Sequence, residues 1–371
     1  MKRAPERAAT TRAVRAAVPR KAGAPLSIER LELEAPPEDE VLVRIVAAGI
    51  CRTDIDLCAE HGAAEEPVML GHEGAGVVEQ AGKRVKKVRR GDHVVLSFQS
   101  CGRCSACRRG RFAHCARLYQ ANFGFRRLDG SNALASSGVG GHFFGQFSFA
   151  TFALATERNL VKVPRALPLE LLAPLGCGLQ TGAGTVLNTL RVRKGASVAV
   201  FGSDAVGVAA VMAARIAGAS PIIAVDVVAA RLALALELGP THALDNRRGR
   251  LAARIAAITG GGVDYVLEIT GAPRMRRIGA AVLASRGTLA LVARPDGNAS
   301  LPGRRTRVSV IQGDSVPQRF IPKLIALWRS GRFPIERLVR PYAFAAINRA
   351  IADARRGRTI QPMLRMRAKG V

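Results

Sequence analysis

Two cysteines and a histidine are the residues with the clearest capacity for chemistry. Cys51 lies in Gly-Ile-Cys-Arg-Thr-Asp at 49–54, and His72 lies in Leu-Gly-His-Glu-Gly-Ala-Gly at 70–76. A thiolate and an imidazole, each close to a carboxylate, have the composition of half a catalytic zinc site, in which three protein ligands leave a fourth position open. Cys177 is the natural candidate for the third ligand. A single cysteine is more often an inert core residue, so the remainder of the chain must support this interpretation.

Four further cysteines form a second candidate metal site, with the spacing Cys101-x2-Cys104-x2-Cys107-x7-Cys115. Four thiolates at such spacings can enclose one tetrahedral zinc with no open position, which makes the site structural. Two disulfides or four unrelated cysteines are the alternative, and this spacing disfavours it. Free thiolates also indicate a reducing compartment. Neighbouring arginines are expected to favour the deprotonated sulfurs, namely Arg103, Arg108, Arg109 and Arg111.

The scaffold that positions these groups is expected to have more than one domain. A chain of 371 residues is longer than a single hydrophobic core ordinarily accommodates. Short hydrophobic runs punctuated by Gly and Pro predict an all-β unit up to about residue 98. Residues 119–160 are again strand-like and rich in phenylalanine. Such a cluster favours a core, although a pocket for an aromatic substrate would use the same residues. Strands are predicted at 28–33, 41–47, 76–80 and 92–97.

From residue 197 onward, predicted strands alternate with predicted helices. A strand at 197–201, a turn at 202–207, a helix at 208–217 and a strand ending at Asp226 come in that order. Repeated units of this kind predict a parallel, doubly wound sheet. Asp226 follows the glycine turn by about twenty residues, where a carboxylate accepts the ribose hydroxyls of NAD and repels the extra phosphate of NADP. Further helices and strands continue the pattern, with a helix at 227–238 and strands at 243–245, 263–269 and 288–292.

The formal net charge of +28 raises the question of a nucleic-acid partner. Arginine supplies 47 of the 56 basic residues, in small groups spread along the chain, and aromatic residues are only 5%. Few aromatic side chains on which bases could stack are therefore interleaved with the basic residues. This favours basic residues spread over the whole protein surface, not a specific nucleic-acid site. No apolar run is long and charge-free enough to span a membrane, and the N-terminus lacks an apolar signal core. We expect a cytoplasmic protein; a transit segment at 1–11 is a minor alternative.

Together these motifs resemble a zinc-dependent alcohol dehydrogenase of the medium-chain dehydrogenase/reductase superfamily, over about residues 13–367. The resemblance rests on 49–54, 71–76, Gly-Asp-His-Val at 91–94, the cysteine-rich lobe, 177–184 and the strand–helix–strand unit ending at Asp226. Segments 145–151, 175–184 and 313–318 resemble the aryl-alcohol (benzyl alcohol) dehydrogenase branch.

The resemblance implies an α/β plus all-β fold. A GroES-like catalytic domain would cover 1–177, a Rossmann NAD-binding domain 178–312, and a return to the catalytic domain 313–371. The implied function is that of an oxidoreductase with two zinc ions per chain. It would interconvert a primary alcohol, by the branch an aromatic one, and its aldehyde, with NAD as hydride acceptor.

The resemblance also assigns roles to residues. Cys51, His72 and Cys177 would hold the catalytic zinc, and the four lobe cysteines the structural zinc. Thr53 would pass the alcohol proton outward, Asp54 would orient His72, and Glu73 would approach the metal. The implied cofactor contacts are Arg52, Thr181, Gly202, Asp204, Val206, Gly207, Asp226, Arg231 and Arg365.

Three departures from the family pattern leave alternatives open. Asp204 stands where the second glycine is usual, and at about 4 Å from a pyrophosphate its charge would cost roughly 1 to 4 kcal/mol. Asp56 stands where some relatives carry the last histidine of a proton relay. The segment 299–307 is short where relatives form subunit contacts, so a homodimer or tetramer stays open. A non-catalytic, basic binding or regulatory relative is the alternative function, favoured by Asp204 and the charge but not by the complete ligand set.

Overall fold

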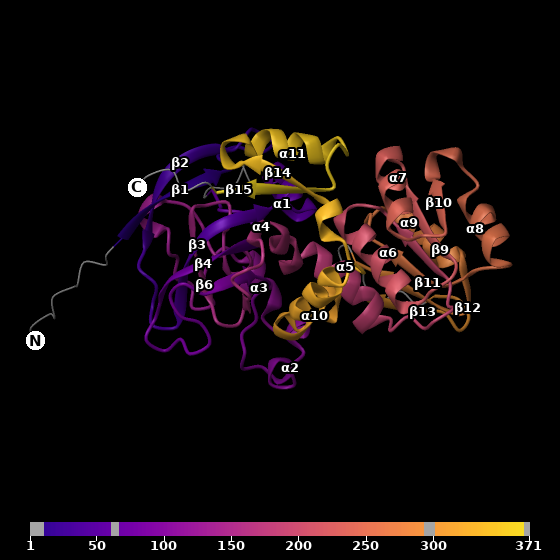
Figure 1. The fold of residues 1–371 in the computed structure, drawn as a ribbon, viewed down its shortest axis with the longest axis horizontal. Helices are drawn as coiled ribbons and strands as arrows, with labels where there is room; N and C mark the ends of the chain where they lie inside the picture. Colours follow the sequence, from indigo (N-terminus) through magenta and orange to yellow (C-terminus); the bar gives the residue numbers. More distant parts are fainter. Residues whose placement is uncertain (1–10, 61–66, 293–300, 367–371) are drawn as a thin grey trace, which may run out of the picture.

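The computed structural model describes residues 11–60, 67–292 and 301–366. Within these ranges the chain forms a β-rich half and a strand–helix half, which lie end to end along the long axis of the molecule (Figure 1). Most of the possible transit segment at 1–11 and the start of the short segment at 299–307 fall outside the described residues.

The β-rich half is built on a seven-stranded sheet that combines five strands from residues 40–163 with two from residues 339–365. The strand order is β14-β15-β3-β4-β5-β7, and β6 pairs with β3; β1 and β2 form a separate antiparallel pair. Only β14 and β15 run parallel, so the sheet is otherwise antiparallel. The strands are β1 Thr11–Val18, β2 Ser27–Glu34, β3 Glu40–Gly49, β4 Glu73–Ala81, β5 His93–Leu96, β6 Phe152–Thr156, β7 Leu160–Val163, β14 Val339–Ala343 and β15 Gln361–Arg365.

The prediction of strands throughout 119–160 is wrong for most of that segment. It contains part of α3 (Leu118–Phe123) and two short 3-10 turns, and only β6 and the first residue of β7 are extended pairing strands. The phenylalanines form a compact irregular core, in which Phe143 and Phe147 are completely buried. His142 and Phe144 have positive φ values of 62° and 55°, which no continuous strand contains.

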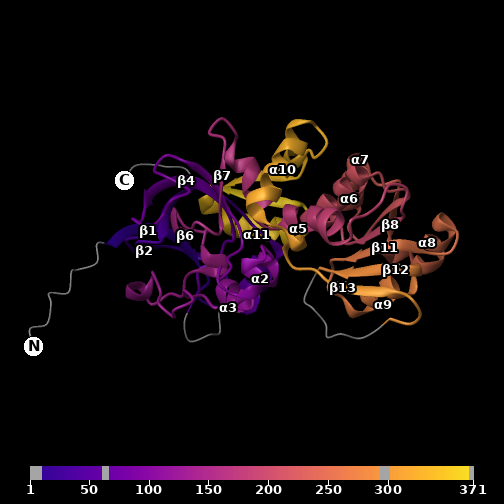
Figure 2. The ribbon, with the colours of Figure 1, turned by 90° about the horizontal axis from the view of Figure 1, so that it is seen from below.

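The second half confirms the predicted Rossmann arrangement. Its six strands are parallel and lie in the order β10-β9-β8-β11-β12-β13, that of a doubly wound dinucleotide-binding sheet. Helices α6 and α7 cover one face and α9 covers the other (Figure 2). Side chains alternate accordingly: Val198 and Val200 pack with α6, whereas Ala199 and Phe201 pack toward α8 and α9. The elements are β8 Val198–Phe201, α6 Ala205–Ala217, β9 Ile222–Asp226, α7 Ala229–Leu238, β10 His242–Asp245, α8 Leu251–Thr259, β11 Val263–Glu268, α9 Pro273–Ala281, β12 Leu283–Leu291 and β13 Thr306–Ser309.

A short helix, α5 (Gly178–Gly184), joins the two halves by packing directly against α6. The contact depends on Gly182, where a Cβ atom would lie 2.0 Å from the carbonyl oxygen of Val206. One hydrophobic cluster continues across the junction, from Val95 and Leu175 on one side to Val208 on the other. The remaining helices are α1 Arg52–Glu60, α2 Ser105–Arg108, α4 Leu169–Leu172, α10 Pro317–Arg329 and α11 Ile347–Arg355.

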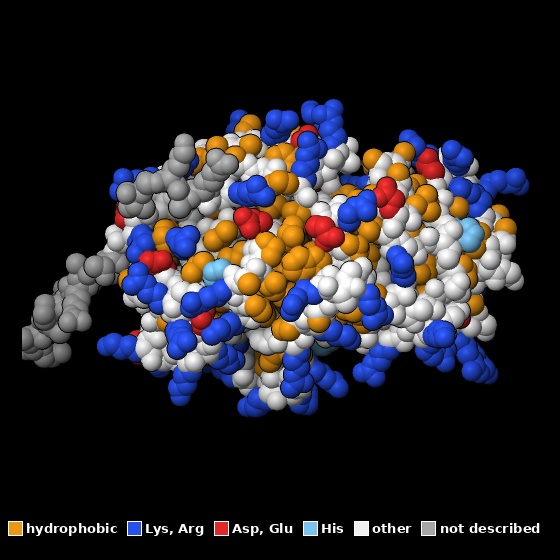
Figure 3. All heavy atoms as spheres, viewed as in Figure 1, with side chains coloured by type: hydrophobic (Ala, Val, Ile, Leu, Met, Phe, Trp, Pro, Cys, Tyr) orange, Lys and Arg blue, Asp and Glu red, His pale blue; other side chains and the backbone are white. Residues whose placement is uncertain are grey.

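Basic side chains are scattered over the surface. On the face shown in Figure 3, Lys and Arg lie over both halves and do not gather into one patch. Among the described residues, none of the helices has the length and apolar character needed to cross a bilayer.

The close approach of α5 and α6 gives a first prediction. Gly182→Ala should separate the helices and lower the free energy of unfolding by about 1–3 kcal/mol, since the new methyl group meets rigid backbone. Chemical denaturation measures the change. Gly279→Ala in α9 is the control: its nearest atoms are side-chain carbons of Leu289 and Val266 at 3.1 and 3.2 Å, which can shift. Equal stability losses in the two variants would contradict the importance of this contact.

Candidate active site and metal sites

Four side chains converge at the junction of the two halves. Cys51, His72, Glu73 and Cys177 each place one ligand atom within 4.8 Å of the others. They come from three places: Cys51 precedes α1, His72 and Glu73 lie at the start of β4, and Cys177 directly precedes α5. All but Cys51, which is partly exposed, are buried. The structure therefore brings together the three predicted ligands and the acidic neighbour.

A buried carboxylate fixes the geometry of this cluster. Asp54 Oδ1 is 3.0 Å from His72 Nδ1 and accepts a hydrogen bond from the N–H of Gly71 at 2.9 Å. Its Oδ2 accepts from the N–H of Cys51 at 3.0 Å. The other imidazole nitrogen, His72 Nε2, is buried without a hydrogen-bond partner. An orphaned buried nitrogen costs about 1–3 kcal/mol, and a bound metal ion would remove that cost.

The two thiols at the cluster also suit a metal ion. The pKa of Cys51 lies well above its ordinary range, because the neighbouring Cys177 and burial both favour the neutral thiol. A divalent cation reverses this preference, since thiolates are its ligands. Gln312 donates from Nε2 to the sulfur of Cys177 at 3.4 Å. Two sulfurs and one imidazole nitrogen are a donor set that fits zinc and leaves a fourth position.

Glu73 links three separate parts of the chain beside this cluster. Its two oxygens accept hydrogen bonds from the N–H of Gly178 at 2.9 Å and from Nε2 of Gln361 at 2.7 Å. Burial raises the pKa of Glu73 to about 7, although His72 and both hydrogen bonds act in the opposite direction.

Besides Gln312, two further glutamines of the site were not predicted from the sequence. Gln361 binds Glu73 from 288 residues away, and Gln146 accepts from the N–H of Gly74 at 3.2 Å while donating to the carbonyl of His72 at 2.9 Å. No spacing in the sequence marks either glutamine, because both reach the site through tertiary packing.

Aromatic rings surround the imidazole of His72. Phe144 stacks on it with 4.4 Å between ring centroids, and Phe143 meets it edge-on at 5.1 Å. Phe123 contacts both phenylalanines at 5.2 and 5.8 Å, and Tyr119, which is 77% exposed, stacks on Phe123 at 5.3 Å. A series of flat apolar side chains thus extends from the candidate metal ligand to the surface.

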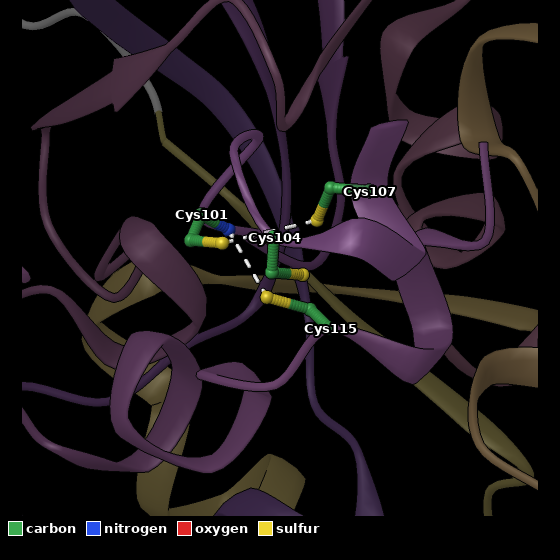
Figure 4. A group of neighbouring side chains, drawn as sticks. All are labelled: Cys101, Cys104, Cys107 and Cys115. Atoms are coloured by element: carbon green, nitrogen blue, oxygen red, sulfur yellow. Dashed lines mark hydrogen bonds between the residues drawn. The ribbon is translucent and has the colours of Figure 1, made fainter. Parts of the chain in front are cut away.

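The four lobe cysteines also converge, with their sulfurs pointing toward one another (Figure 4). All four are free thiols whose ligand atoms lie within 4.8 Å, which rules against the disulfide alternative. The arginines expected to favour the thiolates are all exposed. The main-chain N–H groups of Ala116 and Cys107 lower the pKa of Cys104 to about 6, whereas burial raises the pKa of Cys107 to about 12. His114 in the same lobe places Nε2 at 2.9 Å from Oδ1 of Asp314.

The glycine turn before α6 differs from its prediction in one respect. Helix α6 begins at Ala205, three residues earlier than expected, because Asp204 caps it. Asp204 Oδ1 accepts hydrogen bonds from the N–H groups of Val206 at 3.0 Å and Gly207 at 3.2 Å. Gly202 has φ +103°, and a Cβ at Gly207 would lie 1.9 Å from the Gly202 carbonyl oxygen, so both glycines are required by the turn.

Several other predicted cofactor contacts gather around this turn. Asp226 ends β9, and its Oδ2 accepts from the N–H of Ser203 at 2.6 Å. Arg231 Nε in α7 and Thr181 Oγ1 in α5 are buried without hydrogen-bond partners. Arg52, whose pKa is raised chiefly by Asp56 and also by the charge of Asp204, donates to Asp56 at 2.7 Å. Arg365 lies at the exposed end of β15, paired in register with Ala47.

Comparisons with known proteins agree with this site. Residues 37–165 match the family described as the alcohol dehydrogenase GroES-like domain, and residues 205–322 match the zinc-binding dehydrogenase family.

The chain is 44% identical over 363 residues to a geraniol dehydrogenase from Castellaniella defragrans, and the alignment covers 94% of this chain and 96% of that protein. An alcohol dehydrogenase zinc-binding domain protein from Burkholderia ambifaria superposes with a TM-score of 0.91 at 51% identity. Benzyl alcohol dehydrogenase from Acinetobacter calcoaceticus superposes with a TM-score of 0.91 at 41% identity, and each of these two structures covers 96% of this chain and 100% of its own.

The role of Asp54 gives a second prediction. Asp54→Asn removes the charge and turns an NH2 group toward main-chain donors, so His72 should lose its fixed orientation. We expect affinity for metal at the Cys51–His72–Cys177 cluster to fall about 10- to 100-fold while the cysteine lobe keeps its metal. Elemental analysis after dialysis measures both. Asp56→Asn makes the same charge change in an exposed ion pair and should retain both metals; full retention by Asp54→Asn would refute the positioning role.

Proposed function

Because this chain belongs to the zinc-containing alcohol dehydrogenases of the medium-chain dehydrogenase/reductase superfamily, we propose that it oxidises primary alcohols whose carbinol carbon is attached to an unsaturated carbon. Benzyl alcohol and geraniol are alcohols of this kind, and NAD would be the hydride acceptor. The observation that carries the proposal is the buried cluster of Cys51, His72 and Cys177, with its orphaned nitrogen, next to stacked aromatic rings.

The residues around the cluster have distinct tasks in this proposal. Zinc held by the three ligands would supply a Lewis acid that lowers the pKa of the alcohol hydroxyl. Thr53, with Oγ1 3.9 Å from the sulfur of Cys51, would accept the alcohol proton at the edge of the cluster. Asp54 would hold His72 in one orientation and one tautomer, by accepting from Nδ1. Glu73, which is buried beside the ligands and has a pKa near 7, would balance charge there as the ligands exchange.

We assign the dinucleotide site to the carboxyl edge of the Rossmann sheet. Asp226 would accept the ribose hydroxyls and repel a 2′-phosphate, which is the basis for preferring NAD. The turn formed by Gly202, Val206 and Gly207 would face the pyrophosphate, with Arg52 and Arg365 as its cationic partners. Arg231 would lie beside the adenosine ribose and Thr181 beside the nicotinamide, and the unpartnered polar atoms of both support these assignments. Domains over 1–177, 178–312 and 313–371 would place this site between the two halves.

The substrate class follows from the aromatic rings next to His72. Phe144, Phe143 and Phe123 form an apolar cluster whose rings meet edge to face, at interplanar angles of 68° to 77°. Such a cluster would give a planar substituent on the alcohol further edge-to-face or stacked contacts and leave a short alkyl chain with little contact. The proteins named as geraniol and benzyl alcohol dehydrogenases, to which the chain is similar, support an unsaturated substituent of this kind. The non-catalytic alternative keeps one observation in its favour, the charge of Asp204 at the cofactor turn.

A third prediction concerns metal content. The purified protein should contain two zinc ions per chain, one resistant to chelators and one labile, because four cysteine ligands leave no open coordination position whereas three ligands leave one. Elemental analysis before and after chelation measures this. Cys51→Ser should remove the labile zinc alone, and Cys104→Ser the resistant one. A single zinc in the unmodified protein would favour the non-catalytic alternative.

A fourth prediction tests the substrate class. Benzyl alcohol should have a higher kcat/KM than ethanol, and Phe123→Ala should lower the value for benzyl alcohol about three- to tenfold, the equivalent of one aromatic contact. Steady-state kinetics with both alcohols provide the comparison, and ethanol should be nearly unaffected by the substitution. Tyr119→Ala, one ring further toward solvent, is the matched control and should change neither value. Equal efficiencies for the two alcohols in the unmodified enzyme would refute the proposed class.

A further inference from the structure

We propose, on the basis of the dinucleotide site assigned above, that Asp204 is a built-in competitor of the cofactor: its carboxylate holds the main-chain N–H groups that the pyrophosphate would bind. The affinity of this enzyme for its dinucleotide would then be set by a single side chain at the start of α6.

The competing contact is a helix cap. The first N–H groups of a helix have no partner within the helix and carry the positive end of its dipole, so they attract anions. In α6 two of these groups, on Val206 and Gly207, donate to Oδ1 of Asp204 at 3.0 and 3.2 Å. A dinucleotide would bring its pyrophosphate to the same end of the same helix. The carboxylate and the pyrophosphate cannot accept from the same N–H groups together.

A second carboxylate occupies the preceding part of the turn. Asp226 Oδ2 accepts from the N–H of Ser203 at 2.6 Å, and its Oδ1 accepts from the N–H groups of Val227 and Val228. Three N–H groups of the turn and of the first turn of α6 are therefore bound by the protein's own carboxylates. Asp226 keeps its place when a ribose binds beside it, but Asp204 must give up its two partners.

The charges around Asp204 do not cancel the conflict. Burial raises the pKa of Asp204, and the N–H of Gly207 and the cation of Arg231 oppose that rise, while Asp226 adds to it. From α1, Arg52 also faces Asp204 but is bonded to Asp56. That pair is exposed, with side-chain accessibilities of 70% and 46%, so it is weak and Arg52 can turn to the pyrophosphate easily. The partly buried cap at Asp204, not the exposed pair, therefore limits binding.

The competition should appear as weak binding of the dinucleotide. Two like charges at contact distance correspond to roughly a tenfold to thousandfold loss of affinity, depending on how far water screens them. In exchange, the cap stabilises α6 when no cofactor is present, because an aspartate at this position satisfies two of the orphan N–H groups. A residue that weakens the complex thus stabilises the free protein.

The test compares two substitutions at this position. Asp204→Gly should bind NADH at least about tenfold more tightly than the unmodified protein, as measured by NADH fluorescence titration. Asp204→Asn should lie between the two, because it keeps a capping oxygen but loses the charge. Asp264→Asn is the matched control: Asp264 accepts from Ser197 N–H and Oγ, both at 2.8 Å, at the opposite edge of the same sheet, and its neutralisation should leave the dissociation constant unchanged.

A second measurement separates the cap from the charge. The melting temperature of the cofactor-free protein should fall in Asp204→Ala and stay close to that of the unmodified protein in Asp204→Asn, which retains a cap.

If NADH binds with the same affinity to the unmodified protein and to both Asp204→Gly and Asp204→Asn, the competition is refuted and the proposed enzyme function stands. If NADPH binds in place of NADH, with the same gain in Asp204→Gly, the competition stands and the preference for NAD is refuted. Failure of Asp204→Gly to bind either dinucleotide would overturn both.

Discussion

The carboxylate of Asp54 is the constraint on which the active site depends. It is completely buried, and burying a charge is costly unless hydrogen bonds compensate. Its partners are the imidazole of His72 and the N–H groups of Cys51 and Gly71, so one side chain fixes two ligands and the peptide that leads to β4. The same peptide needs glycine, because Gly71 has φ +91° and a Cβ there would lie 2.4 Å from the backbone nitrogen of Phe149. The ligand geometry is thus set by packing before any metal arrives.

The two halves of the molecule meet through this same site. Cys177, a candidate metal ligand, is the residue before α5, and α5 packs on α6, which follows the turn proposed to bind the cofactor. Glu73 adds a second connection, since its oxygens bind Gly178 at the start of α5 and Gln361 in β15. Metal ligands and dinucleotide turn therefore share one continuous core, and hydride transfer needs such a fixed relation between an alcohol carbon and a nicotinamide ring.

Sequence reasoning succeeded where the chemistry is local. The cysteine spacing of the lobe, the Cys–His–Asp pattern of the active site and the alternation of strands and helices after residue 197 all lie in short windows. It failed where the structure depends on distant partners: Gln146 and Gln361 carry no local signal, and the irregular backbone around Phe144 overrides the strand propensity of its neighbours. The early start of α6 is an intermediate case. An aspartate followed by small helix-forming residues is a helix-start signal, but the glycine pattern around it also indicates a turn.

A contact between His114 and Asp314 joins the cysteine lobe to the segment that reaches the other candidate metal site. Asp314 also accepts from Oγ1 of Thr189 at 2.7 Å, and its neighbour Gln312 donates to the sulfur of Cys177. The cysteine lobe is thus connected to the candidate ligand Cys177 through one short segment, residues 312–314. The segment 312–314 thus holds the cysteine lobe in a fixed position relative to the cluster of candidate ligands, and the lobe is part of the wall that positions Cys177.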